Sequence, residues 1–350
     1  MVKYACSIIF EQFNFSVSAC VISNSLSKSF RPNGDEVTLR TYVRQRSNQV
    51  RQASRQINLI HKVLAQMNIK LNLVISDVTG ETGINIIKAI IAGETDPKKL
   101  AQFRNYRCRS TEAEIAKSLE GNFKPELVFS LKQSFEAYNF FMSQATACEE
   151  NIQEVLDLWQ VKNSDNSVTN NSPKKKKGKN SYSFDATSNL EKILSINITE
   201  IPGLGENLAI KIISEIGTDI SKWPTVKHFS SWLGLCPNNK ISGERVLSSR
   251  TAPSSNKAAE ALRFAAQSLQ FSQTALGAFF RRIMIRTGTA KAITATAHKL
   301  AVILYHMMKE KVAFIEVGQA VYEENYKRRK MANLQRQAKS LGYELVAREA

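Results

Sequence analysis

Two long segments carry apolar side chains at the three- and four-residue spacing of an amphipathic helix. In residues 39–67 the apolar positions follow one another in steps of three, four or seven, and Arg46 interrupts them. In residues 131–159 the same spacing is interrupted at Glu149. Such narrow seams are typical of helices that pair with another helix. We therefore predict two long helices that form either an antiparallel hairpin or an intersubunit coiled coil.

The first of these segments also carries cations outside its apolar seam. They are Arg40, Arg44, Arg51, Arg55 and Lys62. Cations are common on the flanks of coiled-coil helices, where they face water. The same row would suit contacts to a phosphate backbone, and the sequence leaves both interpretations open.

Residues 162–189 interrupt the helical pattern with a stretch rich in Ser, Asn, Lys and Gly. Such a stretch cannot bury enough apolar area to offset the entropy lost on ordering, so we predict a flexible linker. It would separate a coiled-coil helical domain over residues 31–161 from a C-terminal domain over residues 190–350. Four consecutive lysines in it would hold a nucleic-acid backbone without sequence preference, or only keep the linker soluble. They are Lys174, Lys175, Lys176 and Lys177.

The C-terminal domain also shows helical apolar spacing. Residues 262–276 and 292–308 are predicted to be amphipathic or buried helices, and residues 325–346 an exposed basic helix. Together with the two long segments, these patterns predict a mainly α-helical fold.

The charge of the chain narrows the classes of partner. Its 48 Lys and Arg residues exceed its 31 Asp and Glu residues, which gives a formal charge of +17 and a pI of about 9.7. Nucleic acid is therefore the expected partner, and a purely structural coiled-coil adaptor is the least favoured class. No stretch approaches the roughly 18 apolar residues of a membrane span, and the N-terminus lacks the features of a secretory signal. We expect no membrane association and a cytoplasmic location.

The cysteines and histidines predict neither a disulfide framework nor a metal site. The five cysteines are odd in number, widely separated and never spaced as CxxC. The four histidines are equally scattered and form no HExxH pattern. We therefore expect a reduced chain with no metal ligands of these types.

Residues 201–217, IPGLGENLAIKIISEIG, form the most specific short pattern of the chain. Gly203 and Gly205 precede a helix that we predict to begin at Glu206. Such glycines let backbone N–H groups converge at a helix N-terminus, where they can bind a phosphate. The spacing resembles the helix-hairpin-helix element of proteins that bind DNA without sequence specificity. A structural turn between two core helices is the alternative.

Residues 238–250, NNKISGERVLSSR, have no helical or strand periodicity of their own. We predict a loop held at one end by an apolar platform over residues 223–235. Its other end would be held by a helix start at Pro253 and Ser254 or Ser255.

The chemistry of this loop predicts phosphate binding. Ser242 stands before Gly243, whose missing side chain would let a phosphate approach. A serine needs a base or a metal-organised phosphate to become a nucleophile, so Ser248 and Ser249 are rivals of Ser242 on chemistry alone. The neighbouring positive charges are Lys240, Arg245, Arg250 and Lys257.

The order of these features resembles one family. The segment from residue 201 to 237, the 238–250 loop, NKAAEALRFAAQS and TATAHKLAVILYHMMK are similar to the C-terminal domain of certain bacterial insertion-sequence transposases. Those transposases combine a RuvC-like DEDD domain with a serine-bearing domain and use a bridge RNA. Residues 31–83 resemble their coiled-coil region, so the resemblance covers residues 31–350.

The resemblance implies a reaction, partners and a location. It implies DNA strand cleavage and rejoining in transposition, with Ser242 attacking a phosphodiester to form a covalent phosphoserine link and Gly243 following it. DNA and a bridge-type RNA are the implied partners, together with a homo-oligomer assembled through the coiled coil. The implied location is the bacterial cytoplasm at the nucleoid. For the intact family Mg²⁺ is expected, held by the RuvC-like carboxylates.

The N-terminal residues depart from the family pattern. Residues 1–30 contain only Glu11 as an acid, and the Asp pair expected before residue 31 is absent. Asp35 and Glu36 come too late and are interpreted as acids at a helix start, where the helix dipole favours them. We therefore expect an N-terminally truncated copy with a largely missing RuvC-like domain, no identifiable metal ligands and impaired cleavage. The alternatives are a partner of an intact transposase and a non-catalytic nucleic-acid-binding relic.

Overall fold

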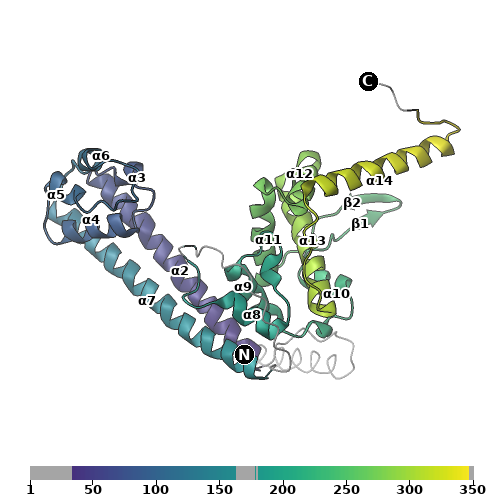
Figure 1. Cartoon of the computed structure of the whole chain (residues 1–350), viewed down its shortest axis with the longest axis horizontal. Helices are drawn as coiled ribbons and strands as arrows, with labels where there is room; N and C mark the ends of the chain where they lie inside the picture. Colours follow the sequence, from purple (N-terminus) through teal and green to yellow (C-terminus); the bar gives the residue numbers. More distant parts are fainter. Residues whose placement is uncertain (1–33, 163–177, 179, 347–350) are drawn as a thin grey trace, which may run out of the picture.

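The computed structural model describes residues 34–162, 178 and 180–346. Within these ranges the chain is mainly helical and contains one two-stranded sheet (Figure 1). The predicted mainly α-helical fold is confirmed. Residues 1–30 and the lysines of residues 174–177 lie outside the described residues, so what the sequence predicts for them stays a prediction.

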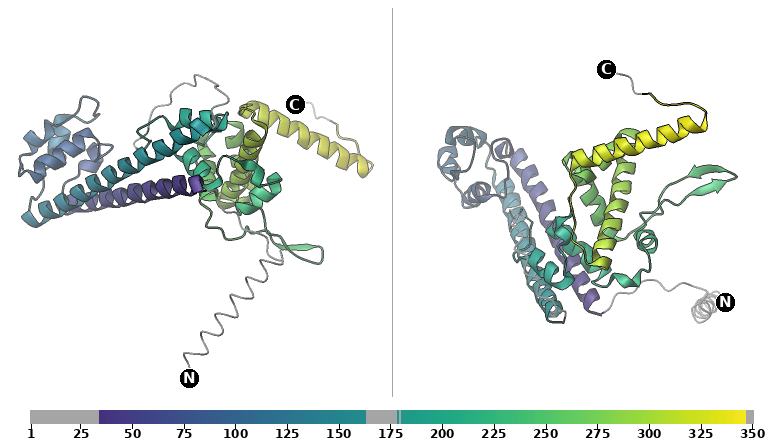
Figure 2. Two further views of the ribbon diagram at one scale, coloured as in Figure 1. Left: turned by 90° about the horizontal axis from the view of Figure 1, so that it is seen from below. Right: turned by 45° about the vertical axis from the view of Figure 1, so that its right-hand side comes forward.

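Two long helices run side by side in opposite directions. Helix α2 (Gly34–Gln66) and helix α7 (Pro125–Lys162) contain the two predicted apolar seams. The views agree that the helices pair along most of their length (Figures 1 and 2). Of the two pairings that the sequence left open, the structure has the antiparallel hairpin within one chain.

The two polar residues that interrupt the seams bind each other. The Nε of Arg46 donates to Oε1 of Glu149 at 2.7 Å, and each side chain is 8% exposed. Two further atoms of the pair bind the C-terminal part of the predicted linker: Arg46 Nη2 donates to the carbonyl of Asn180, and Glu149 Oε2 accepts from the backbone N–H of Ser183. The Arg46 guanidinium also lies 3.9 Å from the ring centroid of Tyr182. The two buried charges are therefore paired with each other and hydrogen-bonded to the backbone.

The predicted linker is too long at its C-terminal end. Tyr182 and Phe184 are buried, and helix α8 (Ala186–Leu194) begins at an N-cap, Asp185, whose side chain accepts from the N–H of Ser188. Burial is the main reason that the pKa of Tyr182 rises to about 12. Two aromatic side chains give this stretch enough apolar area to pack, which the polar composition of residues 162–189 concealed.

Four short helices close the far end of the hairpin. They are α3 (Leu71–Val74), α4 (Glu81–Ile91), α5 (Pro97–Ala101) and α6 (Glu112–Ser118). Their apolar side chains pack against the distal halves of α2 and α7 in one hydrophobic core, to which Leu64, Ile86 and Leu131 belong. This insert is therefore a structural cap for the hairpin.

The C-terminal half consists of short and medium helices and one two-stranded β-hairpin. After α8 the elements are η1 (Ile198–Glu200), α9 (Glu206–Ile216), η2 (Ile220–Lys222), α10 (Val226–Trp232), β1 (Lys240–Ser242), β2 (Arg245–Ser248), α11 (Lys257–Ser268), η3 (Leu269–Phe271), α12 (Ala275–Thr287), α13 (Thr289–Glu310) and α14 (Gln319–Ser340). The predicted helix over residues 292–308 lies within α13 and is confirmed.

The C-terminal helices share a core with the base of the α2–α7 hairpin. Ile213 of α9, Leu262 of α11 and Leu304 of α13 belong to the same buried cluster as Leu39 of α2 and Ile152 of α7. The boundary between the two hydrophobic cores therefore falls partway along the α2–α7 hairpin, and not at the predicted linker. Packing therefore couples the base of the hairpin to the C-terminal half.

The predicted helix over residues 262–276 is wrong in its second part. Helix α11 ends at Ser268, and α12 begins after Thr274, whose hydroxyl accepts from the N–H of Gly277. The Nη1 of Arg281 donates to the carbonyls of Gln270 and Ser272, which the break leaves without helical partners. The apolar spacing continues across the break, so periodicity alone does not reveal it.

Glu36 lies in the first turn of α2, as predicted for an acid at a helix start, and it has a second role. It is buried, and its Oε1 accepts a hydrogen bond of 2.6 Å from Nζ of Lys222 in η2. The carboxylate occupies the space that a side chain at Gly217 would need. Glu36 therefore joins the start of α2 to the C-terminal half.

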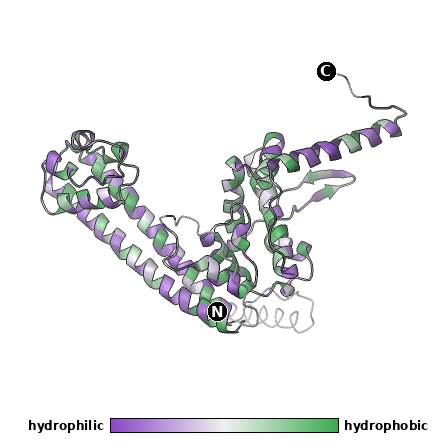
Figure 3. Cartoon of the chain, in the orientation of Figure 1, coloured by the Kyte–Doolittle hydropathy of each residue, from purple (hydrophilic) through white to green (hydrophobic). Residues whose placement is uncertain are grey.

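The last helix, α14, projects from the rest of the molecule. It spans Gln319–Ser340, so it begins and ends six residues before the predicted helix over residues 325–346. None of its residues is buried. Figure 3 shows that most of the helix is coloured as hydrophilic residues. The predicted exposure of this basic helix is confirmed.

The buried ion pair makes a testable prediction about stability. Arg46→Met should leave Glu149 buried without its countercharge and lower the free energy of unfolding by about 3–5 kcal/mol. The double variant Arg46→Met, Glu149→Met removes both charges and should lose less than the single variant. Urea unfolding followed by circular dichroism measures both. A double variant that is less stable than the single one would contradict this account.

Candidate nucleic-acid interface

The predicted loop at residues 238–250 contains a β-hairpin. Strands β1 (Lys240–Ser242) and β2 (Arg245–Ser248) pair antiparallel, so the prediction of a loop without strands is wrong. Gly243 is the first of the two turn residues and has a φ of +59°. Glycine at this position is typical of the type II′ turn, whose twist matches that of paired strands. Gly243 is therefore required by the turn, whatever it contributes to phosphate approach.

The register of the hairpin places the predicted polar residues together. Ser242 lies opposite Arg245, and Lys240 lies opposite Ser248. Leu247 is an extra residue in β2, a β-bulge between the partners of Ile241 and Lys240. Because of this bulge, the Lys240–Ser248 pair faces the same side as the Ser242–Arg245 pair. Because cross-strand partners share a face and alternate residues return to it, all four side chains lie on one face of the hairpin. This face combines two cations with the predicted nucleophile and one of its rivals.

The hairpin is held at its base and projects into solvent. Pro237 and Thr251 form a bridge, and the N–H of Asn238 donates to the carbonyl of Arg250 at 3.2 Å. Arg250 therefore lies at the base, away from the turn that follows Ser242. Figure 2 shows the strands extending away from the helices.

The predicted apolar platform anchors the first arm of the hairpin. Trp223, Phe229 and Trp232 pack together, with ring centroids 4.8 Å apart for the two tryptophans and 5.2 Å apart for Trp223 and Phe229. Tyr305 of α13 packs on Phe229, and its hydroxyl donates to the carbonyl of Trp223 at 2.9 Å. The arm that leads to Ser242 thus leaves from a rigid aromatic cluster, as predicted.

The second arm of the β-hairpin leads to α11, where the predicted phosphate-binding residue Lys257 lies away from the hairpin. The N-cap is Asn256, not Ser254 or Ser255, and its side chain accepts from the N–H groups of Ala258 and Ala259. Lys257 borders a crevice that faces α2. The hairpin lies on the other side of the C-terminal half (Figures 1 and 2). The structure does not bring Lys257 to Ser242.

The two glycines of the 201–205 turn have different surroundings. Gly203 has a φ of +84°, and a Cβ there would lie 2.6 Å from the carbonyl oxygen of Ala265 in α11. Gly205 is the exposed N-cap of α9, and a Cβ there would meet nothing within 4 Å. Gly203 is therefore needed for the turn to pack against α11, which favours the interpretation as a structural turn. Gly205 leaves the N-terminus of α9 accessible to a phosphate.

The cations predicted on the first helix have separate roles. The side chain of Arg40 donates to the carbonyls of Ser214 and Glu215, at the C-terminal end of α9. Arg44 donates twice to the carboxylate of Glu215, at 2.8 and 2.9 Å. These two arginines therefore bind α9, which neither interpretation of the cationic row had foreseen. Arg51 makes no hydrogen bond or ion pair with any residue of the described part of the chain.

A crevice of about 430 Å³ lies between α2, α9 and the start of α11. Four cations border it: Arg44 and Arg51 from α2, Lys211 from α9, and Lys257. Sequence reasoning missed it because the contributing segments are far apart in the chain. The seven-residue spacing of Arg44 and Arg51, which puts both on one face of a helix, was the available signal.

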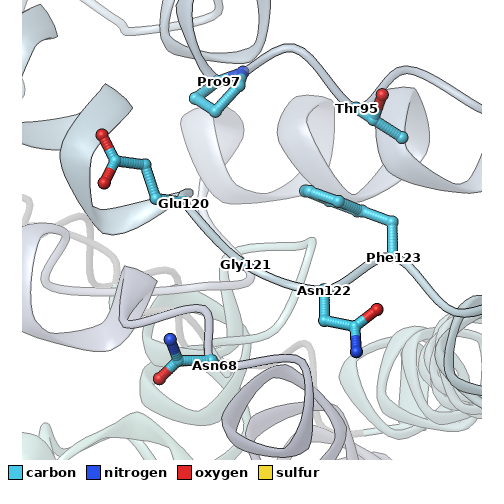
Figure 4. Close-up of a pocket in the computed structure, with 7 residues that line it drawn as sticks. All are labelled: Asn68, Thr95, Pro97, Glu120, Gly121, Asn122 and Phe123. Atoms are coloured by element: carbon cyan, nitrogen blue, oxygen red, sulfur yellow. The ribbon is translucent and has the colours of Figure 1, made fainter.

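A second pocket lies at the far end of the α2–α7 hairpin. It is lined by Asn68, Thr95, Pro97, Glu120, Gly121, Asn122 and Phe123 (Figure 4). Its single charged side chain is an acid, and it includes none of the predicted site residues. It does not suit a polyanion.

The described residues also bear on metal binding and on membrane insertion. Residues 34–162, 178 and 180–346 contain no group of three His, Cys, Asp or Glu side chains placed to hold a metal ion. No helix in the same ranges is both long enough and apolar enough to cross a bilayer.

The turn glycines make a matched pair of variants. Gly203→Ala puts a side chain at a positive φ and against Ala265, so it should lower the free energy of unfolding by at least about 1–3 kcal/mol. Gly205→Ser keeps a favourable N-cap and should cost almost nothing. Thermal unfolding followed by circular dichroism compares them. Equal losses would show that the close approach of the turn to α11 is not needed.

Comparison with known families points to transposition. Residues 196–280 match the family profile described as "Transposase IS116/IS110/IS902 family". The match runs from η1 through the glycine turn, the aromatic platform and the β-hairpin into α12. No curated protein gives a significant match to the chain. The matched segment contains the predicted serine and its neighbouring cations, and it supports the interpretation of the chain as an insertion-sequence transposase that interacts with DNA.

Proposed function

We propose that this chain cuts and rejoins DNA in insertion-sequence transposition, with Ser242 as the nucleophile. The observation that carries the proposal is the polar face of the hairpin, where Ser242 has Arg245 opposite it and Lys240 two residues away. This face lies within the segment that matches the transposase family.

The proposed chemistry is a transesterification. The Oγ of Ser242 loses its proton and forms a bond to phosphorus, while one deoxyribose oxygen leaves the phosphorus and is protonated. Rejoining is the reverse attack by a deoxyribose hydroxyl on the phosphoserine. Lys240 and Arg245 oppose the negative charge that develops on the phosphoryl oxygens, which is the largest contribution expected from such a site.

The other predicted residues have supporting roles in this proposal. Arg250 at the base of the hairpin binds a flanking phosphate, and Gly205 keeps the N-terminus of α9 accessible to another. Helix α8, the glycine turn and helix α9 follow one another in the order of a helix-hairpin-helix element. Activation of the serine requires a base or a metal-organised phosphate.

The proposed partners follow from charge and resemblance. A formal charge of +17 suits nucleic acid, and we propose that DNA is bound together with a bridge-type RNA. We also propose a homo-oligomer in the transposition complex, with the α2–α7 hairpin as its assembly element.

Single substitutions in the hairpin test the proposal. The full chain is incubated with an intact transposase of the same family, bridge RNA and end-labelled insertion DNA, and covalent adducts are separated by denaturing electrophoresis. Ser242→Ala should abolish the adduct formed by this chain. The matched variant Ser248→Ala, on the same face of the hairpin, should retain most of it.

Two outcomes would overturn the proposal. An adduct that persists in Ser242→Ala would move the nucleophile elsewhere. Salt-sensitive DNA binding without any adduct, equal in the wild type and Ser242→Ala, would support a non-catalytic nucleic-acid-binding protein.

A further inference from the structure

The crevice between α2, α9 and α11 has the charge of an anion-binding site. Arg44, Arg51, Lys211 and Lys257 border it, and the acid at its wall, Glu215, is already bound by arginines. With Arg40 and Glu260 included, five cations and two carboxylates leave a formal charge of three positive. A volume of about 430 Å³ is also within the range of about 300–1,000 Å³ that is usual for ligand sites.

Several cations of the crevice are held in place before any ligand binds. Arg44 uses Nε and Nη2 for Glu215, so this contact leaves Nη1 unused. Lys211 and Lys257 lie 3.5 and 3.0 Å from the same carboxylate oxygen of Glu260. Such anchoring reduces the entropy that the side chains lose when they bind a ligand.

Glu260 remains ionised between the two lysines. Burial alone would raise the pKa of this carboxyl, but the hydrogen bond from Lys257 and the charges of Lys211 and Lys257 together lower it. The carboxylate therefore acts as a fixed support that keeps both ammonium groups at the crevice. The N-terminus of α11, a helix of 12 residues, adds its partial positive charge beside Lys257.

Arg51 and Lys257 exceed what the joint between α2 and α9 requires. That joint is already closed by Arg40 and Arg44 on Glu215, and by Lys222 on Glu36. Arg51 is exposed and has no partner within the described ranges, although it borders the same crevice as the two lysines. Cations used only for packing would be expected to face carboxylates, which Arg51 does not.

We infer that this crevice binds phosphate groups of a nucleic-acid backbone, at a second site on the opposite side of the C-terminal half from the Ser242 hairpin. Arg44 and Arg51 line one wall and Lys211 and Lys257 the other, so a strand bound there would contact both α2 and the C-terminal helices. The choice of ligand class rests on the proposed function. The site itself does not depend on catalysis by Ser242.

The test uses the full chain and short single-stranded oligonucleotides of DNA and of RNA. Affinity is measured by fluorescence anisotropy over a range of salt concentrations. The double variant Arg51→Ala, Lys257→Ala should lower the slope of log affinity against log salt by about two, one for each lost phosphate contact. Loss with the DNA probe alone, the RNA probe alone or both supports the site and identifies the strand that occupies it.

The controls separate this site from general charge and from the hairpin. The double variant Lys88→Ala, Arg109→Ala removes the same charge from exposed positions at the far end of the α2–α7 hairpin. It should leave the slope unchanged. Arg51→Lys keeps the charge and should retain the slope, which excludes a folding defect caused by the position itself. Ser242→Ala should also retain it.

The possible results are distinct. A crevice variant that changes the slope no more than the Lys88 and Arg109 control would overturn the inference, even where Ser242 forms its adduct. A lowered slope in a chain that forms no adduct would leave the crevice standing and refute only catalysis by Ser242.

Discussion

The arrangement of the molecule depends on the buried ion pair between Arg46 and Glu149. Each charge lies in an apolar seam, where an unpaired ion would be costly, so α2 and α7 are held in the register that brings guanidinium and carboxylate together. The same two side chains bind the backbone at Asn180 and Ser183 and hold Tyr182 in the core. Because α8 begins directly after this segment, the pair also sets where the C-terminal half starts on the hairpin.

A second group of charges joins the base of the hairpin to α9. Arg40 binds the last carbonyls of that helix, where its dipole favours a cation, and shares the carboxylate of Glu215 with Arg44. The cations of α2 therefore serve the fold first. Arg51, which the joint does not need, borders the crevice together with Arg44, Lys211 and Lys257, so one surface both connects the two halves and offers positive charge to a ligand.

The hairpin of residues 240–248 has a different construction. It carries few packing contacts of its own, and its position comes from the aromatic cluster at its first arm and the bridge between Pro237 and Thr251. An exposed serine between cations on a rigidly anchored hairpin can approach a backbone that is bound elsewhere. The C-terminal half thus presents positive charge on two sides, which suits a polymeric ligand better than a small one.

The sequence by itself determined the features that depend on residues three or four apart: the two seams, the helix over residues 292–308, and the helix that follows the glycine turn. The chemistry of the 238–250 segment left Ser242, Ser248 and Ser249 as candidates, and the choice of Ser242 from the family resemblance stays a prediction. The sequence did not reveal the hairpin, because the strands are only three and four residues long and the bulge at Leu247 disrupts their alternation. Tertiary structure alone decided that Arg46 meets Glu149, 103 residues away, and that Arg44 meets Glu215, 171 residues away. Along the chain, such polar residues are seen only as interruptions of an apolar seam or as charges beside it. Their partners are set by how the helices pack.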